Sequence, residues 1–116
     1  MSRNWVVRLT HQAELDVLDI TQWTAEQFGA LQADQYLETI SLALEALTNG
    51  PETPGVKNRN ELAPNICTLH IARYGRKASH FVVFRVSEEQ LLDILRILHD
   101  RMDLSRHIPD SPFLPH

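Results

Sequence analysis

Residues 91–98 form the most constraining stretch of the sequence, because apolar side chains fill both of its alternating sets of positions. The two sets are Leu92, Ile94 and Leu98, and Leu91, Leu95 and Ile97. Successive side chains of a strand point to opposite faces of a sheet, so the pattern predicts a short strand that is covered on both faces. We therefore expect an interior strand, with one set of side chains on each face.

Arg96 interrupts this run, and titratable residues follow at the strand end, namely His99, Asp100, Arg101 and Asp103. A guanidinium within a buried strand needs a partner or a route to solvent. We expect Arg96 to pair with a carboxylate such as Asp16 or Asp103, or to reach solvent past its neighbours. Arg101 lies beyond the buried stretch and should be freer. The cluster is either a functional site on a rigid scaffold or a solvated strand end.

Two helices are predicted in the first half of the chain, where apolar residues recur every three or four positions. The first helix follows Thr10, a residue suited to capping, and ends near Gly29; its stripe comprises Ala13, Val17, Ile20, Trp23 and Phe28. The second ends at Asn49-Gly50-Pro51, and its stripe comprises Ala33, Tyr36, Leu37, Ile40, Ala43, Leu44 and Leu47. The short break between them predicts an antiparallel hairpin. We assign both stripes to the core and give them no chemistry.

Strand patterns replace the helical period in the rest of the chain and also precede the first helix. The predicted strands are residues 5–9, 66–74, 79–86 and 91–98. Tight connections between the last three predict an antiparallel meander. The fold class is thus α+β in the order β-α-α-β-β-β, with a helical hairpin packed on a small, mostly antiparallel sheet.

The expected organisation is a single domain over residues 1–108, followed by a loosely ordered, proline-rich tail at residues 109–116. Residues 51–65, which contain three prolines, read as a linker within that domain. Cys67 is the single cysteine, and we expect it to be buried in a strand of a protein from a reducing compartment. No apolar run approaches the length of about 18 residues that a membrane span requires, and no signal peptide is evident. A cytoplasmic protein with no membrane partner is expected.

Charge is distributed unevenly along the 116 residues, whose formal net charge is −4. Residues 9–56 contain no Lys or Arg and eight acidic residues, whereas residues 57–85 contain six basic residues and one acidic residue. This asymmetry suits a charged partner. The same asymmetry is equally explained by an acidic helix pair whose charge is neutralised by a basic sheet within the molecule.

No motif for nucleotide binding or serine hydrolysis is found. The six histidines are scattered and form no H-x-x-x-H pair, so no metal or cofactor is expected. His70 and His80, in adjacent predicted strands, are expected to face each other as a hydrogen-bonded pair. Basic side chains gather near two strand ends: Arg73, Arg76 and Lys77, and Arg96, His99, Arg101, Arg106 and His107. Such residues could hold phosphate in an RNA-cleaving site or bind the acidic surface of a protein, and composition leaves both open.

Four segments together resemble the RelE/ParE toxin superfamily of bacterial toxin–antitoxin modules. They are residues 10–17 (THQAELDV) with Ile20 and Trp23 following, Asn49-Gly50-Pro51, residues 80–86 (HFVVFRV) and residues 96–103 (RILHDRMD). The last three are similar to the ParE branch. The resemblance implies a sheet packed by a helical hairpin, a cognate antitoxin transcribed alongside, and room for a higher-order toxin–antitoxin assembly. ParE-type members act on DNA gyrase and stall replication, whereas RelE-type members cut mRNA on the ribosome.

The RelE branch implies a nuclease site at Arg73, Arg101 and His107. The two arginines fall near positions of catalytic arginines in that branch, and His107 stands where the branch places a proton-transferring Tyr or His. The lysine-rich loop of that branch is reduced here to Lys57 and Arg59. An acidic total charge also fits poorly with docking into ribosomal RNA.

The ParE branch is therefore favoured, with gyrase inhibition by binding and neutralisation by an antitoxin. On this interpretation no residue is catalytic, direct nucleic-acid binding is not expected, and Arg96, His99 and Arg101 are the candidates for contact with the target. A non-toxic protein-binding module of the same fold is a third interpretation. The sequence does not identify the antitoxin.

Overall fold

A computed structural model describes residues 4–104. The elements, in order, are β1 (Val6–Leu9), α1 (His11–Phe28), α2 (Ala30–Ala46), the 3-10 turn η1 (Leu47–Asn49), β2 (Lys57–Asn58), β3 (Ile66–His70), β4 (His80–Ser87) and β5 (Leu91–His99). The predicted order is confirmed, with one addition. The segment interpreted as a linker contains the two-residue strand β2, which is too short to carry an alternating pattern.

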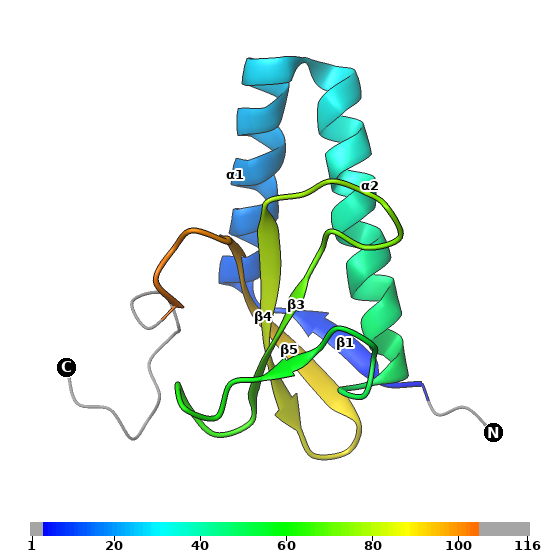
Figure 1. The fold of residues 1–116 in the computed structure, drawn as a ribbon, viewed down its shortest axis with the longest axis vertical. Coiled ribbons are helices and arrows are strands. Elements are labelled where there is room, and N and C mark those ends of the chain that lie inside the picture. The colour runs from blue at the N-terminus through cyan, green and yellow to red at the C-terminus, as the bar shows by residue number, and fades with distance from the viewer. Residues whose placement is uncertain (1–3, 105–116) are drawn as a thin grey trace.

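The strands form one sheet in the order β1-β5-β4-β3-β2 (Figure 1). β1 runs parallel to β5, and the other three pairs are antiparallel. β5 therefore lies between two strands, as its continuous apolar run predicts. Parallel pairing of β1 with β5 places the start of α1 against the sheet, because α1 follows β1 at once. No helix in residues 4–104 is long and apolar enough to span a membrane.

A β-bulge changes the predicted faces of β5. Val83 pairs with Arg96 and Phe84 pairs with Ile94, so Leu95 is an extra residue in the ladder. One extra residue reverses the alternation beyond it. Ile97 consequently shares the core under the helices with Leu92 and Ile94, while Leu95 and Leu98 face the other side. The prediction that both faces are covered is confirmed, but the assignment of Ile97 and Leu98 to their faces is wrong.

The helical hairpin covers one face of the sheet. Thr10 caps α1: its Oγ1 accepts the N–H of Ala13 at 3.2 Å and donates to the carbonyl of Ile94 at 2.9 Å, which ties the helix start to β5. Gly29, with φ of 94°, ends α1 and begins α2. Ala13, Ile40, Ala43 and Leu47 are buried against the sheet, and small side chains among them let the helices approach closely.

The connecting end of the hairpin projects beyond the strands (Figure 1). There the apolar stripe of α1 extends past the sheet, so Trp23 is 57% exposed and Phe28 is 66% exposed. Assigning these two aromatic residues to the core was therefore wrong. The opposite sheet face carries a second, smaller cluster that comprises Ala63, Ile66, Val83, Leu95, Leu98 and Leu104. Cys67 is buried in β3, as predicted.

Candidate functional site

The titratable residues at the end of β5 lie beneath the projecting hairpin. His80 opens β4, His99 closes β5, and the two residues pair directly across the ladder. Their rings meet edge to face, with centroids 5.2 Å apart, and Tyr36 of α2 approaches His80 in the same manner at 5.5 Å. Antiparallel pairing of β4 with β5 thus joins two histidines that are 19 positions apart in the sequence. His80 faces His99, and the predicted pairing of His80 with His70 is wrong.

A hydrogen bond joins Tyr36 Oη to His80 Nδ1. Because Tyr36 Oη already accepts the N–H of Ser79 at 3.0 Å, we assign the tyrosine proton to the bond with His80. Burial, and then the neighbouring His99, lower the pKa of His80 to about 4. Burial also raises the pKa of Tyr36. Both side chains are therefore uncharged at neutral pH.

Asp100 follows β5 and remains charged. His70 Nε2 donates to Asp100 Oδ2 at 3.0 Å, while His70 Nδ1 accepts the N–H of Ala72 at 3.0 Å. The hydrogen bond from His70 is the main cause that lowers the pKa of the Asp100 carboxyl. His99 Nδ1 accepts the N–H of Arg101 at 3.2 Å, and the Arg101 side chain itself is exposed. The strand end therefore presents the Asp100 carboxylate and, near it, the exposed guanidinium of Arg101.

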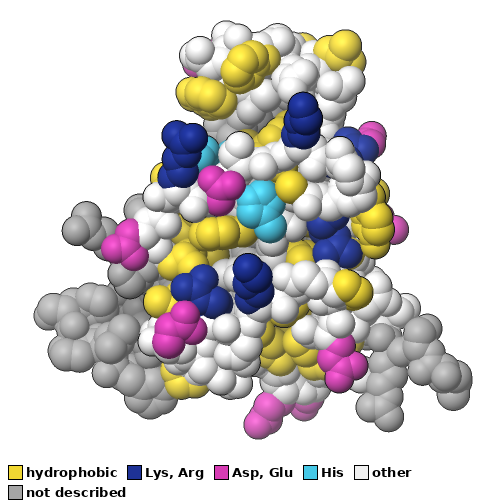
Figure 2. Space-filling view, viewed as in Figure 1, with side chains coloured by type: hydrophobic (Ala, Val, Ile, Leu, Met, Phe, Trp, Pro, Cys, Tyr) yellow, Lys and Arg dark blue, Asp and Glu magenta, His cyan; other side chains and the backbone are white. Residues whose placement is uncertain are grey.

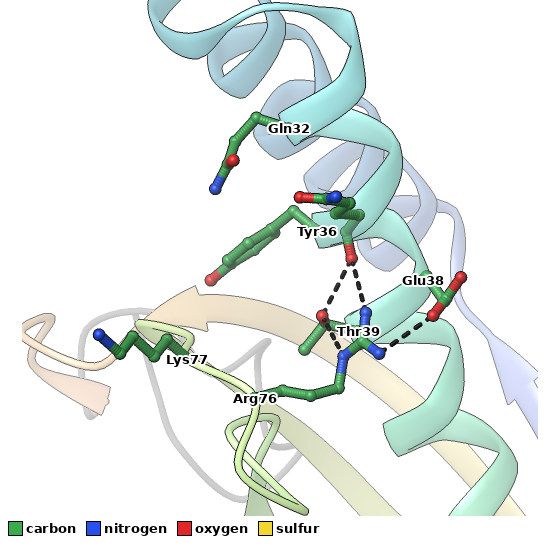
Figure 3. A pocket seen from close by; sticks show the side chains of 7 residues that line it. Gln32, Tyr36, Glu38, Thr39, Arg76 and Lys77 are labelled. Carbon is green, nitrogen blue, oxygen red and sulfur yellow. Dashed lines mark hydrogen bonds and ion pairs between the residues drawn. The ribbon is translucent and has the colours of Figure 1, made fainter.

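Two adjoining cavities open beside this cluster. The smaller, of about 280 Å³, lies between the hairpin and the sheet end; its lining residues are Trp23, Thr24, Phe28, Gln32, Tyr36, Ser79, His80 and His99. The larger, of about 460 Å³, shares Gln32 and Tyr36 and continues past Thr39 to Arg76 and Lys77 (Figure 3). The two cavities share Gln32 and Tyr36 in their walls, and together we call them the hairpin cleft.

The two cations of the larger cavity differ in availability. Arg76 is turned toward α2, where it contacts Glu38 at 3.0 Å, the Thr39 hydroxyl at 2.8 Å and the Gln35 carbonyl at 3.2 Å (Figure 3). Lys77 is exposed and makes no ion pair within residues 4–104. Lys77 is therefore the cation of this cavity that an anionic group can approach.

The candidates for target contact separate in the structure. His99 and Arg101 lie at the hairpin cleft or beside it, whereas Arg96 is turned to α1. Its Nε donates to Asp16 Oδ2 at 2.8 Å, which confirms the predicted pairing, and its side chain is 21% exposed. Arg96 thus lies mainly within the fold.

The nuclease candidates are not brought together within the described residues. Arg73 donates to the Pro54 carbonyl at 2.6 Å and lies over the ring of Tyr74, with its charge 5.1 Å from the ring centroid. Its Nε is buried without a hydrogen-bond partner in the described part of the chain. No contact links Arg73 to Arg101 there, and His107 lies outside the described residues.

Sequence reasoning missed four residues of the hairpin cleft: Trp23, Phe28, Tyr36 and His80. The helical stripes placed the first three in the core. One signal was available, because Trp23 and Phe28 are five positions apart, which departs from the spacing of three or four that a buried stripe requires. The direct pairing of His80 with His99 depends on the register, which the bulge shifts.

Solved structures with the same fold include two toxin–antitoxin assemblies. A chromosomal ParDE system from P. aeruginosa aligns with a TM-score of 0.67 at 21% identity, over 84% of this chain and 98% of that chain. The toxin–antitoxin complex RelBE2 from Mycobacterium tuberculosis aligns with a TM-score of 0.57 at 19% identity, over 83% and 98%. These likenesses show that the two solved structures share the arrangement of this hairpin and sheet.

Sequence comparison identifies the branch. The family described as ParE toxin of type II toxin–antitoxin system, parDE, matches residues 7–104. Toxin ParE of Escherichia coli is 34% identical over 105 residues, which are 88% of this chain and 91% of the relative. Toxin ParE1 of Mycobacterium tuberculosis is 29% identical over 108 residues, 93% of this chain and all of the relative. The chain belongs to the ParE toxin family.

Proposed function

We propose that this protein is the toxin of a toxin–antitoxin pair and inhibits DNA gyrase by binding it. The family match over residues 7–104 carries this proposal. The toxin domain in this proposal is residues 1–108, and its place of action is the cytoplasm. Partly exposed His99 and exposed Arg101, at the end of β5, are the proposed contacts with the target. A binding inhibitor needs a stable, shaped surface and no reacting group of its own, which suits an assembly of neutral aromatic side chains.

Neutralisation by an antitoxin is the second part of the proposal. A mainly apolar groove of about 340 Å³ is lined by α1, α2 and the last residue of β1. Its lining residues are Leu9, Glu14, Val17, Leu18, Leu37, Ile40, Ser41 and Leu44. A helical antitoxin segment can lay its apolar face into such a groove. Leu18, which is 63% exposed, would then become buried.

The antitoxin contact is tested by co-purification from cells that co-express the neighbouring open reading frame. Leu18→Glu should abolish co-purification, because it replaces an apolar side chain of the groove with a second carboxylate beside that of Glu14. Leu31→Glu is the matched control: Leu31 is also exposed, at 72%, on the projecting end of α2 and outside the groove, and co-purification should persist. Equal behaviour of the two variants would reject the groove as the antitoxin site.

The target is tested with two assays on the purified toxin, gyrase supercoiling and ribosome-dependent mRNA cleavage. Loss of supercoiling without cleavage is expected. Cleavage without an effect on supercoiling would reject the gyrase proposal. Inactivity in both assays, together with normal growth of cells that express the protein, would identify a non-toxic binding module.

RelE-like mRNA cleavage is the second candidate function, and the histidine cluster is the observation that favours it. His80 is neutral at pH 7 and hydrogen-bonded to Tyr36, so the pair resembles the groups that move protons in RNA cleavage. Two observations weigh against it. Arg73 is held by the Pro54 carbonyl, so it is not directed toward the cluster, and the net charge of −4 opposes docking to ribosomal RNA.

A further inference from the structure

We propose that the hairpin cleft is a docking site for a protein segment that carries a tyrosine beside an acidic residue. The ring would enter the smaller cavity, and the carboxylate would approach Lys77. This inference concerns the chemistry of the segment and holds whether or not gyrase is the target.

The walls of the smaller cavity are suited to an aromatic ring. Trp23 and Phe28 contact each other edge to face, with centroids 5.9 Å apart, and both remain more than half exposed. Aromatic rings gain about 0.5–1.5 kcal/mol from such contacts beyond the burial of area. The cavity, of about 280 Å³, has room for a single ring with part of its backbone and is too small for an extended ligand.

The base of the cavity offers hydrogen-bond donors. His80 Nδ1 is occupied by the Tyr36 hydroxyl, and His99 Nδ1 by the N–H of Arg101. An Nδ1 that accepts a hydrogen bond leaves the ring proton on Nε2, and no hydrogen bond to the Nε2 of His80 or His99 is found within residues 4–104. A protonated Nε2 cannot ligate a metal, but it can donate to an oxygen. A phenolic oxygen on a ring that enters between Trp23 and His99 supplies that acceptor.

The charges around the cleft fit one carboxylate. Lys77 and Arg101 are exposed cations, whereas Glu38 neutralises Arg76. Asp100 stays ionised beside His99, with 3.5 Å between its Oδ1 and the imidazole Nδ1. A phosphodiester chain would meet this carboxylate. A single acidic side chain at Lys77 would avoid it.

The surrounding surface favours a protein over a nucleotide. Leu31 lies on the same projecting end of the hairpin and is 72% exposed, although it lines neither cavity. Figure 2 shows hydrophobic side chains at this end of the molecule, and further hydrophobic patches among charged side chains of both signs over the rest of the face. A stacked base would cover Trp23 and leave the aliphatic surface exposed. A protein segment would cover both, as at the centres of protein interfaces, where aromatic anchors are enriched.

The test is an NMR titration of the full chain with the peptide Ac-Glu-Tyr-Glu-NH₂. The two tryptophans provide the reporter and its internal control. The indole N–H signal of Trp23 should shift, whereas that of Trp5, packed on Gly50 at the far end of the hairpin, should not. Ac-Glu-Ala-Glu-NH₂, which lacks the ring, should leave both signals in place.

Two variants test separately the cavity that would hold the ring and the lysine that would contact the carboxylate. Trp23→Ala should weaken binding about tenfold, read from the His99 ring signals, and Lys77→Glu about fivefold. Lys57→Glu makes the same charge change on exposed β2, away from the cleft, and should change the affinity less than about twofold. Because its charge is reversed, the Lys77→Glu variant should bind Ac-Lys-Tyr-Lys-NH₂ more tightly than Ac-Glu-Tyr-Glu-NH₂. Circular dichroism of each variant verifies its fold.

Three results would overturn the proposal. The first is no shift of the Trp23 signal at a peptide concentration of about 10 mM, where even a weak contact would register. The second is tighter binding of uridine monophosphate than of the tyrosine peptide, which would make the cleft a nucleotide site. The third is a Trp23 shift that appears on concentrating the protein alone, with a matching rise in mass by light scattering, which would make a second copy the occupant.

Discussion

Arg96 of β5 and Asp16 of α1 form a two-point ion pair across the boundary between helix and sheet. The Arg96 Nε lies 2.8 Å from Asp16 Oδ2, and its Nη2 lies 3.1 Å from Asp16 Oδ1. Asp16 is buried and also accepts the backbone N–H of Ile97 at 2.9 Å and the side-chain amide of Gln12 at 3.1 Å. One carboxylate thus joins the second turn of α1 to the central part of β5.

Removal of the cation should destabilise the fold. We expect Arg96→Ala to lower the free energy of unfolding by about 2–4 kcal/mol, because it leaves the Asp16 carboxylate buried without its counter-charge. Urea denaturation measures the change. Arg8→Ala is the control: it removes an exposed arginine from its ion pair with the partly buried Asp93, which keeps the hydrogen bond from the Ser87 hydroxyl, and should cost less than about 1 kcal/mol. Equal losses in the two variants would show that burial of Asp16 contributes nothing.

Acid should weaken the fold through His80. Its pKa is about 4 in the folded state and 6.5 when unperturbed, so between these values the unfolded chain binds the proton that the folded state excludes. The free energy of unfolding therefore falls as the pH decreases from 6.5 to 4, on the order of 1–2 kcal/mol after allowance for solvent screening of this half-buried ring.

Urea midpoints at several pH values between 4 and 7 measure this effect. His80→Gln removes the titrating group and should flatten the dependence across this window. The other groups near the ring, His99, His70, Asp100 and Asp16, are retained in that variant and control for their own titration. A slope that is unchanged in His80→Gln would assign the effect to one of those groups.

The sequence predicts the elements well because their signals are local. The spacing of apolar residues and the Thr10 cap define α1, and the apolar run from residue 91 defines an interior strand. The bulge at Leu95, in contrast, has no local signal in the sequence. Both alternating sets of β5 are aliphatic, so a reversal of the faces leaves no trace in the pattern. The spacing of apolar residues likewise predicts that Trp23 and Phe28 are helical. It does not predict that the helix extends beyond the edge of the sheet.

The candidate site depends still more on long-range geometry. His99 and Arg101 were found because the strand end is visible in the sequence as an abrupt change from apolar to charged residues. Tyr36 and His80 become part of the site only through the packing of α2 on the sheet and the register of β4 with β5. Tyr36 and His80 are 44 positions apart, and no short sequence motif predicts their contact.

Gly50 should tolerate no side chain. A Cβ at this position would lie 2.4 Å from Nε1 of the Trp5 indole, and the backbone φ of +88° disfavours any residue with a side chain. We expect Gly50→Ala to cost about 2–4 kcal/mol, measured by urea denaturation, because both the overlap and the backbone strain must be relieved. Gly75→Ala is the matched control: φ is +78° there, but the space is open, so only the strain of about 1 kcal/mol remains. Similar losses at both positions would contradict the role of Trp5.

Arg101 should separate toxicity from stability. Its side chain is exposed beyond β5, and only its backbone N–H takes part in the cluster, through the bond to His99 Nδ1. Arg101→Ala should therefore keep the melting temperature and the antitoxin complex, yet lose most of the growth arrest that the toxin causes. Arg96→Ala should lose growth arrest only in proportion to its unfolding. Growth arrest and the melting temperature are therefore measured for both variants. Arg8→Ala, which removes another exposed cation, on β1, should stay toxic. Full growth arrest by Arg101→Ala, or its unfolding at the growth temperature, would remove Arg101 from the target-binding surface and leave the end of β5 as a solvated strand terminus.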